Sequence, residues 1–356
     1  MPLSRRELLA RLAFGALFIP AVARAPRSVL GSLLFDPDAP VVPTKPVPVN
    51  PFLRDGKALV AIVHGDDPAA MLKAGLELLG GLDRLAVAGK RVLIKPNVVN
   101  RNPPPATTDP RVVRAVAASA KNAGAAEVTV ADSSGIIRFP TSENLTVTGN
   151  RQAAESTGAR VLALEDEPWV RVEPSKAKAL PHYYLSKAVY EADIFINVPV
   201  VKTHRFAHYS CSLKNLVGIT HPRYRPSVTF LSSDWHERIA ELNLAVHPQL
   251  TIADATTIMI AGGPTSGTSA PGNMLILSGD RVALDVTALA LVRSFGAWEK
   301  VEDRTVWEQR QIKRASELGL GVNGPAQVEI LSGSVTAESP EFTRRVEAIR
   351  RDVAGT

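Results

Sequence analysis

The stretch from Lys202 to Asn215 concentrates side chains that could do chemistry on a small anion. It contains Lys202, His204, His208 and Lys214, with small hydroxyl residues between them. A lysine can bind a carboxylate or a phosphate, and a histidine can move a proton near neutral pH. The segment therefore predicts an anion-binding pocket, in which Lys202, Lys214 and Asn215 bind the ligand and His204 or His208 is the acid or base.

A metal is the alternative use of these histidines. His204 and His208 are four residues apart, a spacing that would place them on one face of a helix, and His236 follows later in the chain. The three imidazoles are the candidate ligands if a first-row metal is bound. The spacing also arises by chance, so the sequence leaves the cofactor unknown.

Three further polar clusters directly follow apolar runs that read as strands. They contain Lys95 with Asn97, Asp132 with Ser133, and Asp254. In open α/β sheets ligands bind beyond the carboxyl ends of the strands, where the loops converge. We expect Lys95 and Asn97 to bind the anion, and Asp132 or Asp254 to orient the proton-transferring group. A cap or a turn is the structural alternative for each of these residues.

The elements that would position these clusters alternate between strands and helices. Strands are predicted at 59–63, 91–94, 127–131, 160–164, 193–198, 250–253, 274–277 and 327–331, and helices at 68–79, 110–122, 151–157, 234–246, 280–293 and 341–353. Asp109 is predicted to cap the helix that begins at Pro110. The alternation predicts an α/β fold with a mainly parallel sheet and helices on both faces, with room for a small inserted subdomain within 140–190 or 205–245.

Residues 1–25 are predicted to be a twin-arginine export signal. Arg5 and Arg6 precede a short apolar run, and Ala23-Arg24-Ala25 fits a cleavage site. The run is too short to span a bilayer comfortably, and a basic amphipathic helix or a retained anchor is the alternative. We therefore expect a periplasmic or otherwise extracytoplasmic protein that meets the twin-arginine export machinery and keeps no stable membrane span after cleavage.

The rest of the chain divides into three predicted parts. Residues 26–57 contain seven prolines and are predicted to be a linker or a surface strap, because proline removes amide donors and favours an extended chain. The α/β domain is expected over 58–335, and 336–356 is a charged C-terminal helix or tail.

Composition excludes several classes of protein. The net charge is +6, but about half of it lies in the predicted signal, and no basic run is interleaved with aromatic residues, so nucleic acid is not an expected partner. Cys211 is the only cysteine, which rules out a disulfide, a thiolate zinc site or a cysteine-ligated iron–sulfur cluster within one chain. The glycine-rich segment 262–267 lacks the spacing of a Walker loop, and no G-x-G-x-x-G precedes a predicted helix, so nucleotide binding is poorly supported.

These motifs, in this order, resemble the family known as domain of unknown function 362. The matching segments are 94–97, 108–110 with the helix that follows, 130–132, 196–204, 213–218, 252–255, 263–267 and 280–285. The resemblance spans residues 58–295 and implies an α/β fold without a settled reaction. Many members carry a cysteine-rich, ferredoxin-like module. This chain departs from that pattern, because it has one cysteine.

A weaker likeness is to the nickel-pincer lactate racemase family. In that family a histidine shortly precedes a lysine that holds a covalently attached cofactor. On this likeness His204 or His208 is the acid or base, and Lys214 is the cofactor or substrate anchor. The glycine-rich lead-in to that lysine is absent, since Ser-Cys-Ser-Leu stands at 210–213.

Three functions are consistent with these patterns. The leading expectation is an exported enzyme that acts on a small anionic organic substrate through the lysine and histidine side chains at the strand ends. A non-catalytic periplasmic binding or accessory protein would use the same basic pocket. A cofactor-loaded enzyme of the racemase or oxidoreductase kind is the third, because the twin-arginine route exports folded proteins.

Overall fold

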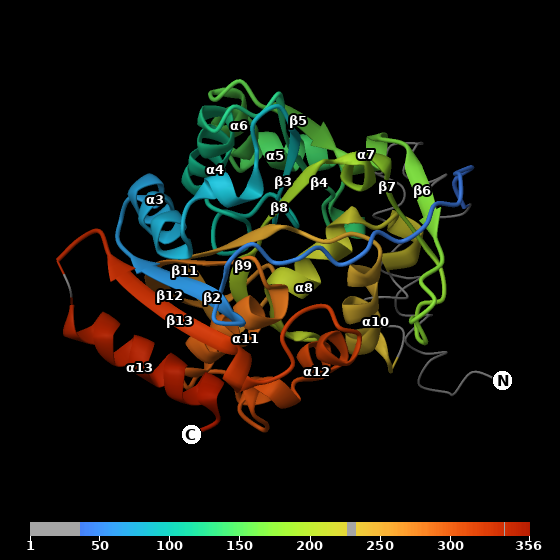
Figure 1. The fold of residues 1–356 in the computed structure, drawn as a ribbon. Helices are drawn as coiled ribbons and strands as arrows, with labels where there is room; N and C mark the ends of the chain where they lie inside the picture. Colours follow the sequence, from blue (N-terminus) through green and yellow to red (C-terminus); the bar gives the residue numbers. More distant parts are fainter. Residues whose placement is uncertain (1–35, 226–232, 338) are drawn as a thin grey trace.

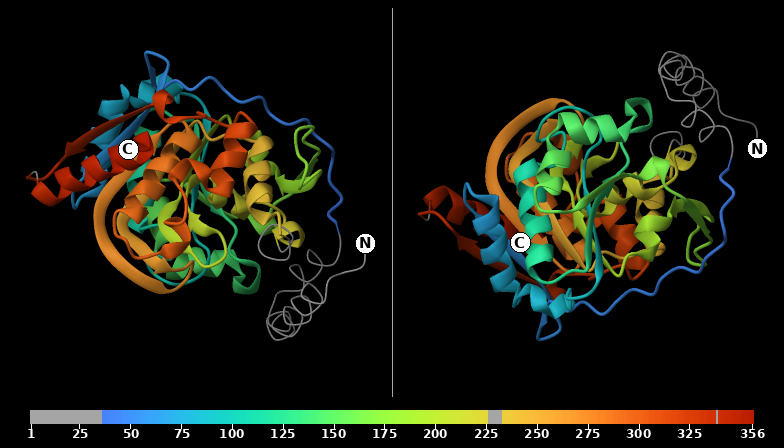
Figure 2. Two further views of the ribbon diagram at one scale, coloured as in Figure 1. Left: turned by 90° about the horizontal axis from the view of Figure 1, so that it is seen from below. Right: turned by 90° about the horizontal axis from the view of Figure 1, so that it is seen from above.

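The computed structural model describes residues 36–225, 233–337 and 339–356 (Figure 1). The export signal predicted for residues 1–25 lies outside the described residues, as does the first part of the predicted strap. Within the described ranges every helix is too short or too polar to span a bilayer. Residues 36–50 run as an extended segment along the outside of the domain (Figure 2), where Val42 N donates to Arg171 O at 2.9 Å.

Eleven of the strands in the described part of the chain form one sheet, and β6 and β7 form a separate pair. The strands are β1 Leu53–Arg54, β2 Lys57–His64, β3 Arg91–Pro96, β4 Glu127–Asp132, β5 Arg160–Ala163, β6 Trp169–Val172, β7 Tyr183–Ser186, β8 Ile194–Val198, β9 Val200–His204, β10 His208–Ser210, β11 Leu250–Gly262, β12 Gly267–Ser278 and β13 Val328–Ser334.

The large sheet is mixed, and most of its strand pairs are parallel. Its order is β1-β2-β12-β11-β8-β3-β4-β5, and β13 pairs with β2 at the edge. The pairs from β11 through β8, β3 and β4 to β5 are parallel, whereas β12 is antiparallel to both β11 and β2. All five residues of β8 are buried, as expected for a strand covered on both faces. The predicted α/β class with a mainly parallel sheet is confirmed.

Helices cover both faces of this sheet (Figures 1 and 2). They are α3 Pro68–Leu79, α4 Pro110–Asn122, α5 Thr141–Val147, α6 Asn150–Glu155, α7 Lys187–Glu191, α8 Ser212–Asn215, α10 Trp235–Glu241, α11 Arg281–Arg293, α12 Arg310–Glu317 and α13 Pro340–Ala354.

The alternation of side chains along each strand explains the two layers. In β2, Val60 and Ile62 pack into the core that α11 completes, whereas Leu59, Ala61 and Val63 pack into the core that α3 and α4 complete. The predicted cap is also confirmed, because the Asp109 carboxylate accepts a hydrogen bond from Arg111 N and α4 begins at Pro110.

The chain around Pro199 differs from the prediction. Lys202 and His204 do not lie in a loop after the strand, because the chain continues as β9 after the break at Pro199, which has no amide to donate. Strand β9 pairs with β11 and forms an antiparallel hairpin with β10. His204 and His208 are therefore opposite each other across a hairpin, and the expectation that they share one face of a helix was wrong.

The hairpin of β11 and β12 is much longer than predicted. The two strands pair from Thr251 and Ser278 out to the turn at 262–267. Sequence analysis found only the apolar ends at 250–253 and 274–277, because the outer half of β12 is polar and largely exposed. The turn contacts the loop that follows β3, because Asn102 Nδ2 donates a hydrogen bond to Thr265 O at 2.8 Å. The domain limits and the inserted subdomain stay predictions.

Candidate functional site

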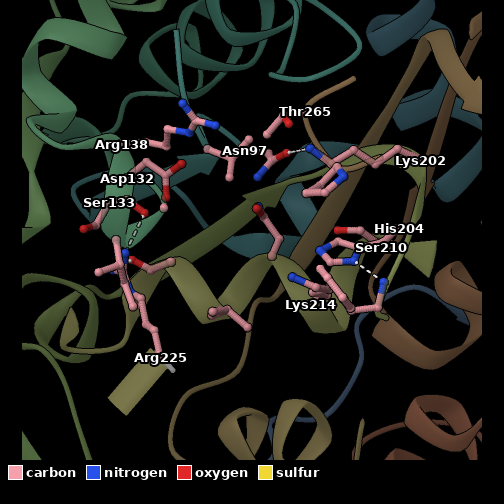
Figure 3. A pocket seen from close by; sticks show the side chains of 18 of the residues that line it. Asn97, Asp132, Ser133, Arg138, Lys202, His204, Ser210, Lys214, Arg225 and Thr265 are labelled. Atoms are coloured by element: carbon pink, nitrogen blue, oxygen red, sulfur yellow. Dashed lines mark hydrogen bonds between the residues drawn. The ribbon is translucent and has the colours of Figure 1, made fainter. Parts of the chain in front are cut away.

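A cavity of about 360 Å³ lies beyond the carboxyl ends of β3 and β4, beside β9 and α8. The structure brings seven of the nine predicted site residues to its wall: Lys95, Asn97, Asp132, Lys202, His204, Lys214 and Asn215. They come from segments more than 100 residues apart in the chain. Figure 3 shows that five of these side chains converge on one space, namely Asn97, Asp132, Lys202, His204 and Lys214.

The wall of this cavity carries an excess of positive charge. Five cationic side chains of the described residues line it, namely Lys95, Lys202 and Lys214 with Arg138 and Arg225. Asp132 is the carboxylate among the described lining residues. Such an arrangement stabilises a negatively charged ligand, because the cations have too few counter-charges of their own.

One of the lysines is paired with the carboxylate. Lys95 Nζ lies 2.5 Å from Asp132 Oδ1, and both side chains are almost fully buried. Asp132 Oδ2 accepts a further hydrogen bond from Val98 N at 2.6 Å. Burial lowers the pKa of Lys95, and the charge of Asp132 opposes that shift. The pair is close to neutral as a unit, so it leaves the remaining cations uncompensated.

A glycine makes room for this ion pair. A Cβ atom at Gly218 would lie 2.6 Å from Asp132 Oδ1 and 2.7 Å from Lys95 Nζ. Both distances are shorter than any ordinary contact with a Cβ, so the pair could not keep its geometry beside a larger residue. Gly218 ends the Leu213–Gly218 segment that sequence analysis matched to the family.

Lys202 combines burial with two acceptor contacts. Its Nζ donates to Asn97 Oδ1 and to Ala106 O, the latter at 2.6 Å. Burial, and next the charge of Lys214, lower the pKa of Lys202 to about 7. A neutral amine keeps both of these hydrogen bonds, because it has two N–H groups to donate. The third position on the nitrogen can then hold either a proton or a lone pair at neutral pH.

His204 is positioned as a hydrogen-bond donor. Its Nδ1 accepts hydrogen bonds from Phe206 N at 3.2 Å and Ala207 N at 3.1 Å. Burial holds the pKa of His204 well below its ordinary value, and the charge of Lys214 adds to the shift. The neutral ring therefore carries its proton on Nε2. This geometry favours donation from Nε2 over the base role expected from the sequence, because a proton on Nδ1 would displace two backbone donors.

The short helix α8, which carries Lys214, is held at its start by a carboxylate to which sequence analysis gave no role in the site. Asp285 of α11 accepts hydrogen bonds from Ser212 N at 2.6 Å and Leu213 N at 3.1 Å, at the start of α8. Burial raises the pKa of Asp285 to about 7. The amine of Lys214 has no hydrogen-bond or ion-pair partner among the described residues, and burial lowers its pKa to about 8.

The two predicted amides contact lysines of the wall. Asn97 Oδ1 accepts from Lys202, and Asn215 Oδ1 accepts from Lys95 Nζ at 3.4 Å. The other end of Asn215 donates to Asn197 Oδ1 at 2.8 Å. These contacts orient the amines of Lys202 and Lys95. Asn97 and Asn215, which were expected to bind the ligand, therefore also position lysines of the wall.

Two arginines of the cavity were not identified from the sequence, and Ser133 was noted as a member of the polar cluster after β4 without a site role. Arg225 is 2% exposed, and its guanidinium donates to carbonyl oxygens, among them Gly218 O at 3.0 Å. Burial lowers the pKa of Arg225 to about 10. The Ser133 hydroxyl is buried without a hydrogen-bond partner in the described structure. Arg138 follows the β4 cluster by six residues, and a search of that loop for cations would have found it.

Asp254 and His208 lie outside the cavity wall. Asp254 Oδ2 accepts from Asp109 N at 2.8 Å, and Oδ1 accepts from Thr256 N at 3.0 Å. These are the contacts of a turn that fixes the start of α4. The rings of His208 and His236 lie 4.9 Å apart. Across the described ranges no three His, Cys, Asp or Glu side chains are grouped so that they could hold a metal ion.

A sequence model of one protein family matches this chain over residues 92–290, and its description is Domain of unknown function (DUF362). The match covers more than half of the chain. The chain belongs to the DUF362 family. The matched region runs from β3 into α11, so it contains the whole wall of the cavity and Asp285. All residues of the site therefore lie within the region that the family model matches.

Two known proteins are similar to this DUF362 chain. A thylakoid-associated protein of Synechocystis sp. is 29% identical over 235 residues, which cover 61% of this chain and 67% of that protein. The structure of the lactate racemase apoprotein from Thermoanaerobacterium thermosaccharolyticum superposes with a TM-score of 0.44 and 10% identity, over 83% of this chain and 87% of that one. The second likeness bears on neither the ligand nor the reaction.

Proposed function

We propose that this DUF362 protein is an enzyme that binds a small organic anion in the cavity and transfers a proton on it. The observation that supports the proposal is the excess of cationic side chains around one cavity, among which Lys95, Lys202 and Arg225 are buried. Lys214 carries the argument furthest, because it is half-buried and its amine has no hydrogen-bond or ion-pair partner among the described residues. An ammonium that is partly removed from water without a counter-ion is costly, and an anionic ligand would offset that cost.

Lys202 is the group that we propose moves the proton. With a pKa of about 7 it exchanges between amine and ammonium at neutral pH, which is the condition for general acid–base catalysis. As a base, the Lys202 lone pair takes a proton from a C–H or O–H bond of the substrate, and the electron pair of that bond stays on the substrate. His204 donates from Nε2 to the oxygen on which the negative charge grows, and Lys214 binds the anionic group.

The test has a binding step and an exchange step. Small carboxylates and phosphates are screened by isothermal titration calorimetry, and each ligand is then incubated with the protein in deuterated water and followed by NMR. We expect a carboxylate or a phosphate to bind and to exchange a C–H proton for deuterium. Lys202→Arg should retain binding and lose exchange, because a guanidinium stays protonated. Lys187→Met, at an exposed lysine outside the cavity, is the control and should retain both.

Each outcome separates the candidate functions. Binding that is never followed by exchange favours the non-catalytic binding or accessory protein, which uses the same wall. Exchange that survives in Lys202→Arg would assign the proton transfer to another residue. If no small anion binds, the proposal is wrong. The intact mass and metal content of protein from its native host test the third candidate, a cofactor-loaded enzyme.

We also propose that the protein works outside the cytoplasm. The Arg5-Arg6 pattern before a short apolar run supports export by the twin-arginine machinery. The similar Synechocystis protein is described as thylakoid-associated, which is in keeping with a site beyond the cytoplasm. Fractionation of cells that express the wild type or a variant with Lys at positions 5 and 6 tests this. A periplasmic product in both would refute the signal.

A further inference from the structure

Apart from the Lys95–Asp132 ion pair, the cationic side chains of the cavity, together with His204 and Ser133, form two groups at opposite ends. One group, here called the amine end, consists of Lys202, His204 and Lys214. The other, here called the guanidinium end, consists of Arg138, Arg225 and Ser133. Figure 3 shows the two groups on opposite sides of the cavity, with Asn97 between them. They come from different parts of the fold, since the amine end lies on β9 and α8, and Ser133 and Arg138 follow β4.

The ion pair of Lys95 and Asp132 interacts with both ends, since the charge of Asp132 acts on Lys202 and on Arg225. Lys95 and Asp132 lie 2.5 Å apart and compensate each other. The charge of Arg225 acts on Lys95, and the charge of Lys95 acts on Lys214. Neither arginine is among the charges that shift the pKa of Lys214, of which burial is the largest cause. Because the lysines and the arginines lie on opposite sides of the cavity, an anionic group bound at one end leaves the cations of the other end available to a second group.

The guanidinium end has free hydrogen-bonding capacity of its own. The Ser133 hydroxyl is 4% exposed and has no hydrogen-bond partner in the described structure. The guanidinium of Arg225 donates its hydrogen bonds to backbone carbonyls and forms no ion pair with the described residues, although the charges of Glu165 and Asp132 act on it and oppose the lowering of its pKa by burial. Arg138 forms no ion pair with any of the described residues. The hydroxyls of Ser186, Thr203 and Thr220 are also buried without a partner, but Ser133 is the one of these four that lines the cavity, so a bound ligand could supply its hydrogen bond.

We propose that the ligand is a dianion, with one carboxylate or phosphate at the amine end and a second at the guanidinium end. The inference rests on the proposed function, because it names the class of anion that the same cavity takes. The part of the ligand between the two anionic groups lies beside the apolar wall formed by Val99 and Val217. A cavity of about 360 Å³ is at the lower end of small-molecule sites, and it suits a compact organic molecule.

The test compares ligands that differ by one charge. Unbranched dicarboxylates of three to eight carbons, the monocarboxylates of the same lengths, and ω-phosphonocarboxylates are titrated into the full chain by calorimetry. The best dianion should bind at least about tenfold more tightly than the monoanion of its length, because a charge-assisted contact is worth about one factor of ten or more. The phosphonate series shows whether the cavity accepts a phosphonate in place of one carboxylate.

Substitutions then assign the two ends. Arg138 is exposed, so Arg138→Gln should fold, and we expect it to weaken the dianion about tenfold while the monoanion is unaffected. Lys214→Gln should weaken both ligands, and Arg160→Gln, at an exposed arginine paired with Glu127 far from the cavity, should weaken neither. Equal affinity for dianions and monoanions, or an Arg138→Gln variant that keeps the full ratio, overturns the dianion while simple anion binding stands. Absence of binding by any of these anions refutes both proposals.

Discussion

The proton of Lys202 can be followed through the stability of the protein. Its pKa is lowered from 10.5 to about 7, first by burial and then by Lys214. Between these two values the unfolded chain holds the proton that the folded protein has released. Because the unfolded state binds more protons in this window, the free energy of unfolding rises with pH. The rise due to Lys202 is about 1.4 kcal/mol per pH unit, or roughly 2.5 kcal/mol between pH 7.5 and 9.5.

The variant Lys202→Met isolates this contribution. The variant lacks the titrating amine. Between pH 7.5 and 9.5 the free energy of unfolding of the wild type should therefore rise by roughly 2.5 kcal/mol relative to that of the variant. Below about pH 6 Lys202 is protonated in both the folded and the unfolded wild type, so the difference should be flat there. The measurement is urea unfolding at half-unit pH steps, followed by circular dichroism.

The control and the refuting result are equally direct. Lys187→Met removes an exposed lysine that lies 3.6 Å from Glu191 and outside the cavity, and it reports what the loss of any lysine does. If the difference between wild type and Lys202→Met does not vary from pH 7.5 to 9.5, Lys202 keeps its proton throughout. It could not then be the base at neutral pH, and the catalytic part of the proposal would be wrong.

Three further predictions concern residues around the cavity. Asp285→Asn should remove a pH dependence of stability, because the pKa of this carboxyl is raised from 3.8 to about 7. The protonated carboxyl stabilises the fold below pH 4, and this contribution is lost as the pH rises to 7. In urea unfolding the free energy of the wild type should fall over this range by up to about 4 kcal/mol relative to that of the variant. Gly218→Ala should cost about 1–3 kcal/mol and weaken anion binding by calorimetry, since its Cβ would collide with Lys95 and Asp132. Asp254→Asn should lower the melting temperature and leave the affinity for anions unchanged, because its carboxylate contacts the chain at the start of α4 and does not line the cavity. If the variant instead keeps its stability and loses much of its affinity for anions, Asp254 takes part in ligand binding.

The sequence predicted the elements best where the signal is local. The helix at Pro68–Leu79 has the predicted limits, with Asp67 at its start and Gly80 at its end. The outer part of the β11–β12 hairpin was missed, because its residues are polar and their pairing depends on a partner strand that lies across a turn. The break at Pro199 was visible, but the new strand after it was not, since β9 exists only through its contacts with β10 and β11.

The sequence by itself determined the class of fold, the family and the edge of the sheet at which polar residues gather. These follow from apolar periodicity and from the rule that parallel strands end at one edge, which need no knowledge of distant contacts. The tertiary structure alone decided which of those residues share a cavity: Asp132 does, and Asp254 instead fixes a helix start. It also decided the protonation of Lys202 and His204, because burial by segments far away in the chain sets the pKa of each group.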